Sequence, residues 1–304
     1  MVFEEVVVLS LPFAEAHFGL KPRPKLGSYY KRRVIRLEPP YLINLSVLLV
    51  AMLILKETRR EGLAEHFLAS AAYLHNFIYA DHSWINTVAW SLEVEVQFYV
   101  LAPLFSCVFA IRNKGVRRGV LVAIMSISAL LNERMRGTAP PAVYLSLAGY
   151  LHYFLVGFLL TDWYLIDRPL APGKDYRWDL LGAAAWAGIG FGLIKVATPR
   201  YLLVPLILVA CVAAFRGRLT NLLLRLSWLT TIGGMCYTIY LYHYAILTGL
   251  GEWSWSLNRP SWPFWVNYLC QLAILGLPIL VLSGILFALF ERPFMRIAGS
   301  RHRG

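Results

Sequence analysis

The sequence has little charge, and most of the charge it has is of one sign. Only 15% of its 304 residues are charged, with 29 lysines and arginines against 17 acidic residues, while 58% are hydrophobic. The mean hydropathy is +0.57. Soluble domains carry about a quarter charged residues, so this composition excludes an ordinary soluble protein. It predicts a chain that crosses a membrane several times.

The sequence also lacks the short signatures of several familiar enzyme classes. It has no glycine-rich loop ending in Lys-Ser or Lys-Thr, no Cys and His cluster at metal-ligand spacing, and no Gly-x-Ser-x-Gly turn. A nucleotide-binding loop, a metal site and a serine nucleophile of that kind are therefore not expected. The four cysteines lie in apolar runs without paired spacing and are expected to be small core residues; they are Cys107, Cys211, Cys236 and Cys270.

What the sequence does have is a series of apolar runs, from which we expect an all-α, polytopic transmembrane helical bundle of about eight spans. The expected spans are 41–55, 84–111, 117–131, 142–166, 178–197, 201–215, 228–250 and 264–290. The stretch 63–80 is less apolar because it holds polar residues such as His66 and His75, and we expect an interfacial or re-entrant helix there.

The basic residues predict an orientation in the membrane. With eight crossings, residues 21–36, 112–118, 168–177, 216–225 and the tail from 291 fall on one side and hold 21 of the 29 lysines and arginines. The positive-inside rule makes that side cytoplasmic. We therefore expect one membrane domain over residues 1–304: a basic cytoplasmic segment at 1–40, the bundle at 41–290, and a cytoplasmic tail at 291–304.

One apolar run carries two carboxylates, and a charged side chain inside a bilayer costs several kcal/mol unless it faces a protein interior or a water-filled cavity. The run extends from Trp90 to Tyr99. If it is helical, Ser91, Glu95 and Tyr99 share one face, whereas Glu93 and Gln97 share another. At most one of the two acids therefore points at any single site, and this run is the first candidate for a functional site.

Three arginines near the start of the chain form a second candidate. Arg32, Arg33 and Arg36 lie within one helical turn of one another. They are explained either as a positive-inside anchor or as a clamp for the phosphates of a cofactor, since a planar guanidinium group matches phosphate oxygens.

Polar residues in the later runs form a third group of candidates. His243 follows Tyr240 by one turn on the same face, and it is either a hydrogen-bonded structural residue or a titrating group in a cavity. Asp162 lies close to the predicted cytoplasmic end of its run, where solvation would suffice, and neither it nor His152 receives a role.

Four motifs follow one another along the chain: Tyr29-Tyr30-Lys31-Arg32-Arg33 with Arg36 and Pro39-Pro40-Tyr41; Trp90-Ser91-Leu92 with Glu95, Gln97, Phe98, Tyr99 and Pro103; Tyr237 to His243; and Glu291-Arg292-Pro293-Phe294. In these motifs and their order the chain resembles the acyltransferase-3 family of bacterial multi-spanning membrane O-acyltransferases. The resemblance implies about ten helices with both termini cytoplasmic, in the cell's inner (plasma) membrane. It also implies transfer of an acyl group, commonly acetyl from acetyl-CoA, to a hydroxyl of a glycan, a lipid-linked sugar or another small acceptor.

The resemblance also implies roles for residues of this chain. Glu95 and His243 would be catalytic, and Ser91, Tyr99 and Tyr240 would line the substrate site. The donor acyl-CoA would be held by Arg32, Arg33 and Arg36, with no metal, and the partners would be the lipid bilayer and the acceptor, not nucleic acid.

The chain differs from the family pattern at its start. Family members typically begin with a helix that carries an Arg or Lys and, about eleven positions later, a histidine; no histidine here has that partner, so we expect the family fold without its first two helices. Two other functions stay open: a transporter or flippase of a lipid-linked or acidic substrate, and a truncated, inactive family member that acts as a scaffold.

Overall fold

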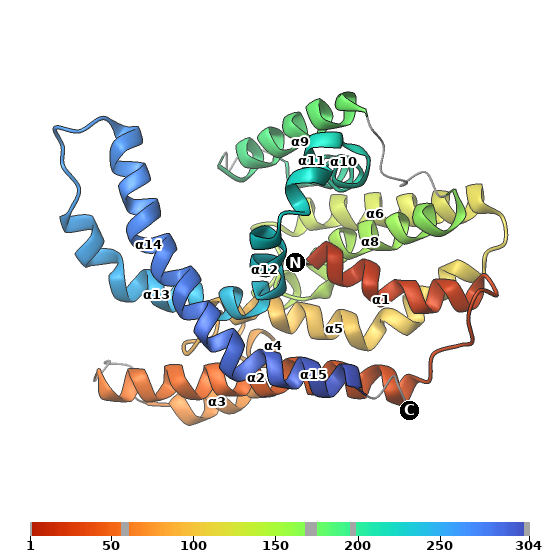
Figure 1. Cartoon of the computed structure of the whole chain (residues 1–304). Coiled ribbons are helices and arrows are strands. Elements are labelled where there is room, and N and C mark those ends of the chain that lie inside the picture. Colours follow the sequence, from red (N-terminus) through yellow and green to blue (C-terminus); the bar gives the residue numbers. More distant parts are fainter. Residues whose placement is uncertain (1, 56–60, 168–174, 195–198, 301–304) are drawn as a thin grey trace. The chain divides into compact units, whose positions relative to one another are not determined.

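The computed structural model describes residues 2–55, 61–167, 175–194 and 199–300, and within these ranges the regular structure is helical, without strands (Figure 1). The predicted all-α class is confirmed. The α-helices are α1 (Val2–His17), α2 (Leu26–Ile54), α3 (Leu63–Ala71), α4 (His75–Tyr79), α5 (Trp90–Phe105), α6 (Lys114–Met135), α7 (Pro141–Tyr144), α8 (Leu147–Ile166), α9 (Tyr176–Ile194), α10 (Leu203–Arg216), α11 (Arg218–Leu224), α12 (Ser227–Gly234), α13 (Cys236–Ser256), α14 (Phe264–Leu286) and α15 (Arg292–Ser300). Short 3₁₀ turns lie at Thr87–Ala89, Ser106–Ala110 and Arg200–Leu202, and a π-helical turn lies at Phe287–Glu291.

The helices form two compact units. The first contains Met1–Leu26 and Val94–Thr230, and the second contains Gly27–Glu93 and Thr231–Gly304. Helix α5 therefore begins in the second unit and continues into the first. The predicted division at residue 40 does not fall between elements, because α2 runs without a break from the basic residues through the first apolar run.

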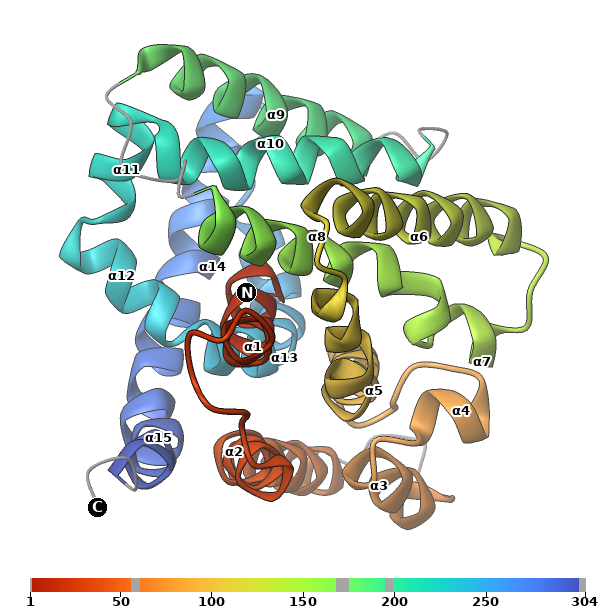
Figure 2. The same cartoon turned by 90° about the vertical axis from the view of Figure 1, so that its right-hand side faces the viewer.

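In the first unit, α1 and α6 both pack along α8 (Figures 1 and 2). Helix α1 buries Leu9, Phe13 and Ala14. The hydroxyl of Ser10, which is also buried, forms a 2.7 Å hydrogen bond with the hydroxyl of Thr161. Since a buried hydroxyl without a partner is costly, this bond satisfies one buried polar atom on each of the two helices.

A buried ion pair joins α6 to α8. Arg117 donates from Nε to one oxygen of Asp162, and Arg118 donates from Nε to the other at 2.6 Å. The side chain of Asp162 is fully buried and that of Arg117 is 2% exposed. The prediction that Asp162 is merely solvated is therefore wrong: its charge is balanced by Arg117 and Arg118, which lie near the start of the packed helix α6.

Helices α10 and α11 are bent by 82° relative to each other at Gly217. The carboxylate of Asp179 on α9 accepts hydrogen bonds from the backbone N–H groups of Arg218, Leu219 and Thr220, which have no acceptor within their own helix. A Cβ atom at Gly217 would lie 2.4 Å from the Asp179 carboxylate and 2.8 Å from the carbonyl of Ala213. Only glycine lets the chain approach this closely.

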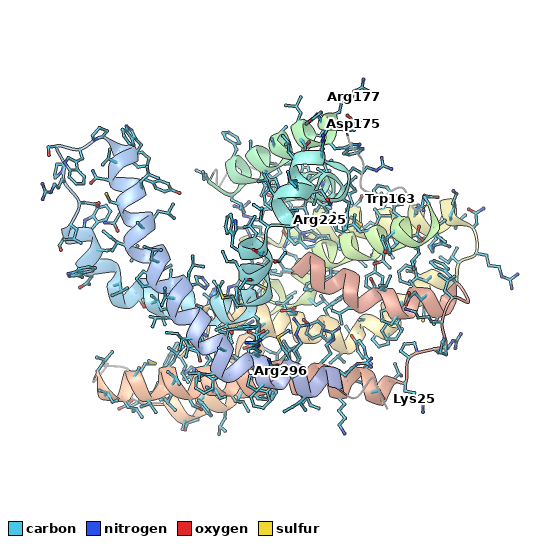
Figure 3. The ribbon with its side chains drawn as sticks, in the orientation of Figure 1. Lys25, Trp163, Asp175, Arg177, Arg225 and Arg296 are labelled. Atoms are coloured by element: carbon cyan, nitrogen blue, oxygen red, sulfur yellow. The ribbon has the colours of Figure 1, made fainter. Side chains whose placement is uncertain are left out.

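The N-terminal end of α9 is polar. At the start of α9, the carboxylate of Asp175 accepts a hydrogen bond from the backbone N–H of Arg177, at 2.9 Å. The Arg177 side chain extends away from the ribbon there (Figure 3). Both side chains are exposed. Residues 168–174 of the predicted basic loop lie outside the described residues, as do 301–304 of the predicted tail.

In the second unit, two asparagines tie α2 to α13. Nδ2 of Asn86 donates to Oδ1 of Asn44 at 2.7 Å and to the backbone carbonyl of Leu241 at 3.1 Å. Nδ2 of Asn44 donates to the same carbonyl at 3.2 Å. A carbonyl has two lone pairs, so one backbone oxygen of α13 accepts from both amides. Both asparagines are buried.

Five helical stretches among the described residues are long and apolar enough to cross a membrane: Leu26–Ile54, Thr87–Ala110, Lys114–Met135, Pro141–Ile166 and Phe264–Ile297. The bent pair α10 and α11 makes six if it counts as one span. The prediction of about eight also included α9 and α13. Both form helices, of 19 and 21 residues, but glycines and charges in α9, and tyrosine, tryptophan and serine in α13, lower their hydropathy. Residues 195–197 of the expected span 178–197 lie outside the described residues.

The apolar surface agrees with a membrane setting. Helix α14 exposes large side chains along its length, among them Leu269, Leu277 and Leu282. Contiguous apolar surface of this extent needs a cover, and lipid supplies it in a multi-pass membrane protein. The four cysteines form no disulfide, but they are not core residues as expected: Cys107 is exposed and the other three are half-buried.

We expect the substitution Asp162→Asn to destabilise the protein by about 3–5 kcal/mol, because it leaves two arginines beside a neutral side chain in a buried place. Thermal unfolding of the detergent-solubilised chain, followed by tryptophan fluorescence, measures the change. Asp167→Asn is the matched control, since Asp167 pairs with Lys114 and Arg118 near the surface, where ion pairs contribute little. Equal losses in both variants would contradict the importance of burial.

Candidate active site

Helix α13 is hydrogen-bonded to all three of the other motifs that the sequence singles out. The Tyr237 hydroxyl donates to the backbone carbonyl of Leu37, the residue after the arginine motif, at 3.1 Å. The Thr238 hydroxyl donates to the Glu291 carboxylate at 2.5 Å. The Tyr240 hydroxyl lies 2.5 Å from the hydroxyl of Ser91. Four segments far apart in the sequence are thereby joined within the second unit.

The direction of the Tyr240 hydrogen bonds is fixed by their chemistry. The Tyr240 hydroxyl contacts both the backbone carbonyl of Val88 and the Ser91 hydroxyl. A carbonyl only accepts, so Tyr240 donates its proton to Val88. Ser91 must therefore donate to the Tyr240 oxygen. Two of the three predicted substrate-site residues, Ser91 and Tyr240, are thus brought together, and the start of α5 is fixed against α13.

His243 lies one turn after Tyr240, with the two ring centroids 5.8 Å apart. Its Nδ1 atom lies 2.7 Å from the backbone carbonyl of Tyr240, which again can only accept. Nδ1 therefore carries the hydrogen, and in the neutral ring Nε2 carries the lone pair. The side chain is half-buried. This tautomer suits a proton acceptor, although a structural histidine would make the same backbone contact.

The three arginines share the first half of α2, as predicted, and all are half-buried. Two prolines, Pro39 and Pro40, come after them inside the same helix. Because proline has no N–H group, the carbonyls one turn earlier, at Ile35 and Arg36, lose their helical donors. The arginine motif thus ends at an interruption of the helix hydrogen bonds, next to the Leu37 carbonyl that Tyr237 binds.

Glu95, the acid predicted to be catalytic, lies on the part of α5 that belongs to the first unit. The Tyr99 hydroxyl donates to the carboxylate of Glu95, one turn earlier on the helix, and both residues are 4% exposed. The predicted sharing of a face by these two residues is confirmed. Gln97, predicted on another face, accepts a 2.8 Å hydrogen bond from the backbone N–H of Leu147 at the start of α8.

Glu93, to which the sequence pattern assigns no role, anchors a neighbouring segment. Its buried carboxylate accepts a 2.8 Å hydrogen bond from the backbone N–H of Asn76 in α4. The Asn76 side chain in turn donates to the backbone carbonyl of Trp90 at 2.9 Å. The start of α5 therefore holds α4 by two hydrogen bonds. The sequence signal for this role was that the Trp90 motif holds an acid besides Glu95. That acid, Glu93, lies two positions before Glu95 and so on a different face of the helix.

Glu291 is the other acid with a role the sequence did not assign. It is 1% exposed and accepts from Thr238, in a π-helical turn between α14 and α15. Such turns are often retained at functional sites. The closing motif, which was predicted to begin the tail, therefore positions α13.

The structure thus places the predicted site residues in two groups. Glu95 and Tyr99 belong to the first unit; Ser91, Tyr240, His243 and the three arginines belong to the second. Within the ranges that the structure describes, no group of three or more His, Cys, Asp or Glu side chains is arranged to hold a metal ion.

We expect Glu93→Leu to loosen α4, because it leaves a backbone N–H without its acceptor at a buried position, which costs about 1–3 kcal/mol. Glu93→Gln keeps an acceptor oxygen and should retain most of the anchoring. Hydrogen exchange of the amides of residues 75–79, measured by mass spectrometry, distinguishes the two variants. The exposed Glu65, changed to Gln, is the control; faster exchange in that variant as well would argue against a specific anchor.

Comparisons with known proteins give one family and several relatives. The model of a family described as an acyltransferase domain (Acyl_transf_3) matches residues 9–290. The chain is 25% identical over 257 residues to the O-acetyltransferase OatA of Staphylococcus aureus, covering 73% of this chain and 41% of that protein. It is 27% identical over 252 residues to the peptidoglycan O-acetyltransferase OatA of Listeria monocytogenes, covering 74% of this chain and 40% of that protein. The chain spans about two-fifths of the length of these relatives. No solved structure matches it.

Proposed function

Because the chain belongs to the acyltransferase-3 family, we propose that it is a membrane O-acyltransferase that moves an acetyl group from acetyl-CoA to a hydroxyl group of a glycan. The glycan is proposed because the Listeria relative is named for peptidoglycan. The observation that carries the proposal is the set of hydrogen bonds by which α13 joins the four family motifs in one unit. Contact between all four family motifs supports the idea that they form one functional site.

The donor is proposed to bind through the arginine face of α2. Arg32, Arg33 and Arg36 lie within one turn, are half-buried, and supply planar groups that bind phosphate oxygens through two parallel hydrogen bonds. The positive-inside rule puts this half of α2 at the cytoplasmic side of the plasma membrane, which is where CoA is available. The acceptor then approaches from the opposite side, where α2 ends and α3 begins.

The chemical step needs a base and a group that orients the reacting atoms. An acceptor hydroxyl must lose a proton as it attacks the thioester, and His243 Nε2, which carries the lone pair, is suited to accept that proton or to hold the acceptor. The carboxylate of Glu95, paired with Tyr99, is proposed to orient or polarise groups at the reacting centre, and Ser91 and Tyr240 to contact the substrate.

We expect Arg36→Ala to raise the KM for acetyl-CoA by about tenfold or more, since a charge-assisted hydrogen bond contributes about 1.5–3 kcal/mol. Arg36→Lys should have an intermediate effect, because lysine keeps the charge but not the planar fork. Release of free CoA by the purified chain in nanodiscs, with soluble peptidoglycan fragments as acceptor, provides the rates. Arg177→Ala, at an exposed site in the first unit, is the control. An unchanged KM in Arg36→Ala would place the donor site elsewhere.

Substitution of Glu95 should affect the rate of the chemical step and not donor binding. We expect Glu95→Gln to lower kcat by about a hundredfold, as misplaced reacting groups do, while the KM for acetyl-CoA stays near its original value. Glutamine can still accept from Tyr99, so the fold is retained. Asp175→Asn is the control at an exposed acid. A folded Glu95→Gln variant that acetylates at the original rate would remove this residue from the site.

A further inference from the structure

Two imidazoles of the second unit are hydrogen-bonded to each other. His66 on α3 and His75 at the start of α4 are both buried, and Nδ1 of His66 lies 2.7 Å from Nε2 of His75. Nδ1 of His75 lies 3.1 Å from the backbone carbonyl of Asp81. The three groups form a short chain of polar contacts in a segment that the sequence predicted only as an interfacial or re-entrant helix.

The chemistry of this chain of contacts fixes where each hydrogen lies. The Asp81 carbonyl can only accept, so His75 donates to it from Nδ1. The Nε2 atom of neutral His75 is then an acceptor, and His66 must donate to it from Nδ1. The remaining nitrogen of neutral His66, Nε2, therefore carries a lone pair. The arrangement ends in a proton acceptor whose tautomer is set by two consecutive hydrogen bonds.

The surroundings hold the His66 ring in place and put a glycine at its Nε2 edge. The ring is stacked between Tyr79 and Trp84, with centroid distances of 4.0 and 3.7 Å. At its Nε2 edge lies Gly62, an exposed glycine with φ 77°, where an added Cβ would sit 3.9 Å from Nε2. Glycine adds no side chain at this edge, and the carboxylate of Glu65 lies 3.9 Å from the same Cβ position. Aromatic faces also stabilise a cation, so the clamp favours the imidazolium that forms when Nε2 takes a proton.

The charges around the pair are mixed. Burial lowers the pKa of His66 below its ordinary value of 6.5, which the carboxylates of Glu65 and Asp81 partly oppose. Burial also lowers the pKa of His75; the hydrogen bond to the Asp81 carbonyl opposes this shift, and the neighbouring His82 adds to it. Both rings are therefore neutral at pH 7, which is the state in which His66 accepts a proton.

We propose that His66 is the general base that deprotonates the acceptor hydroxyl, and that His75 is a positioning residue that fixes its tautomer. The inference rests on the proposed function. As Nε2 of His66 takes the proton, the acceptor oxygen bonds to the thioester carbonyl carbon; the carbon–sulfur bond breaks, and the imidazolium returns the proton to the CoA thiolate. His243 then has a supporting role. Since Glu93 holds α4, the Trp90 motif is connected to this base through His75 and Asn76.

Acetyl transfer from acetyl-CoA to soluble peptidoglycan fragments tests the proposal in the full chain. We expect His66→Gln to lower kcat by about a hundredfold or more with little change in the KM for acetyl-CoA. The rate of the unsubstituted chain should fall with acidification below pH 6.5, and this fall should be absent from the residual activity of His66→Gln. His75→Leu should lose activity, whereas His75→Gln, which can still accept from His66, should recover part of it. His82→Gln, the same change at an exposed neighbour, should retain the full rate.

A second measurement does not depend on turnover. Diethyl pyrocarbonate modifies neutral imidazole nitrogens, and mass spectrometry of the labelled full chain identifies the site. We expect His66 to be labelled with half-maximal rate below pH 6.5 and His75 to be protected, because both nitrogens of His75 are engaged in hydrogen bonds.

The outcomes separate this inference from the proposed function. Absence of acetyl transfer by the unsubstituted chain, with His66 labelled as expected, contradicts the proposed function but supports the accessible, lone-pair-bearing His66. Full activity in His66→Gln, or an acid limb that disappears in His243→Gln and persists in His66→Gln, overturns the inference while the proposed function stands. Labelling of His75 in preference to His66 also overturns it.

Discussion

The hydrogen bonds along α13 hold the second unit together, because they are made by side chains of one helix to backbone and side-chain groups of three other segments. Tyr237, Thr238 and Tyr240 are nearly consecutive, yet they bind α2, the π-helical turn and the start of α5. The Leu241 carbonyl adds the two asparagine amides. Positions on successive sides of a helix point in different directions, so a short run of tyrosines and threonine can reach several neighbours at once.

The need for hydrogen-bond partners also explains how three buried acids are accommodated in this apolar chain. A buried carboxylate is tolerated when it has a hydrogen-bond partner, and Asp162, Glu93 and Glu291 each have at least one. These acids differ in what their partners do. The arginines of Asp162 join two helices of the first unit, whereas Glu93 holds the helix that carries His75. Polar groups of the second unit can therefore serve the proposed chemistry by positioning other residues, as Glu93 does for the helix of His75, without touching a substrate.

Two histidines in the second unit carry a lone pair at Nε2, because each donates a hydrogen bond from Nδ1. His243 donates from Nδ1 to its own helix, and His66 donates from Nδ1 to a second imidazole. The two rings differ in how their surroundings would support a protonated state. A backbone carbonyl in its own helix supports either a structural or a chemical role, whereas His66 is clamped by two aromatic rings and backed by an acceptor that is itself oriented. This difference favours His66 as the base.

The sequence alone determined the all-α class, the membrane setting, the family motifs and the common face of Glu95 and Tyr99, because composition and helical spacing are local properties of the chain. It misjudged Asp162, and it left Glu93, His66 and His75 without a role. Those roles depend on contacts between residues such as Glu93 and Asn76, or Ser91 and Tyr240, whose pairing no spacing rule predicts. Only the tertiary structure brings such partners together, and a histidine's tautomer, like an acid's partner, is set by the atoms it meets there.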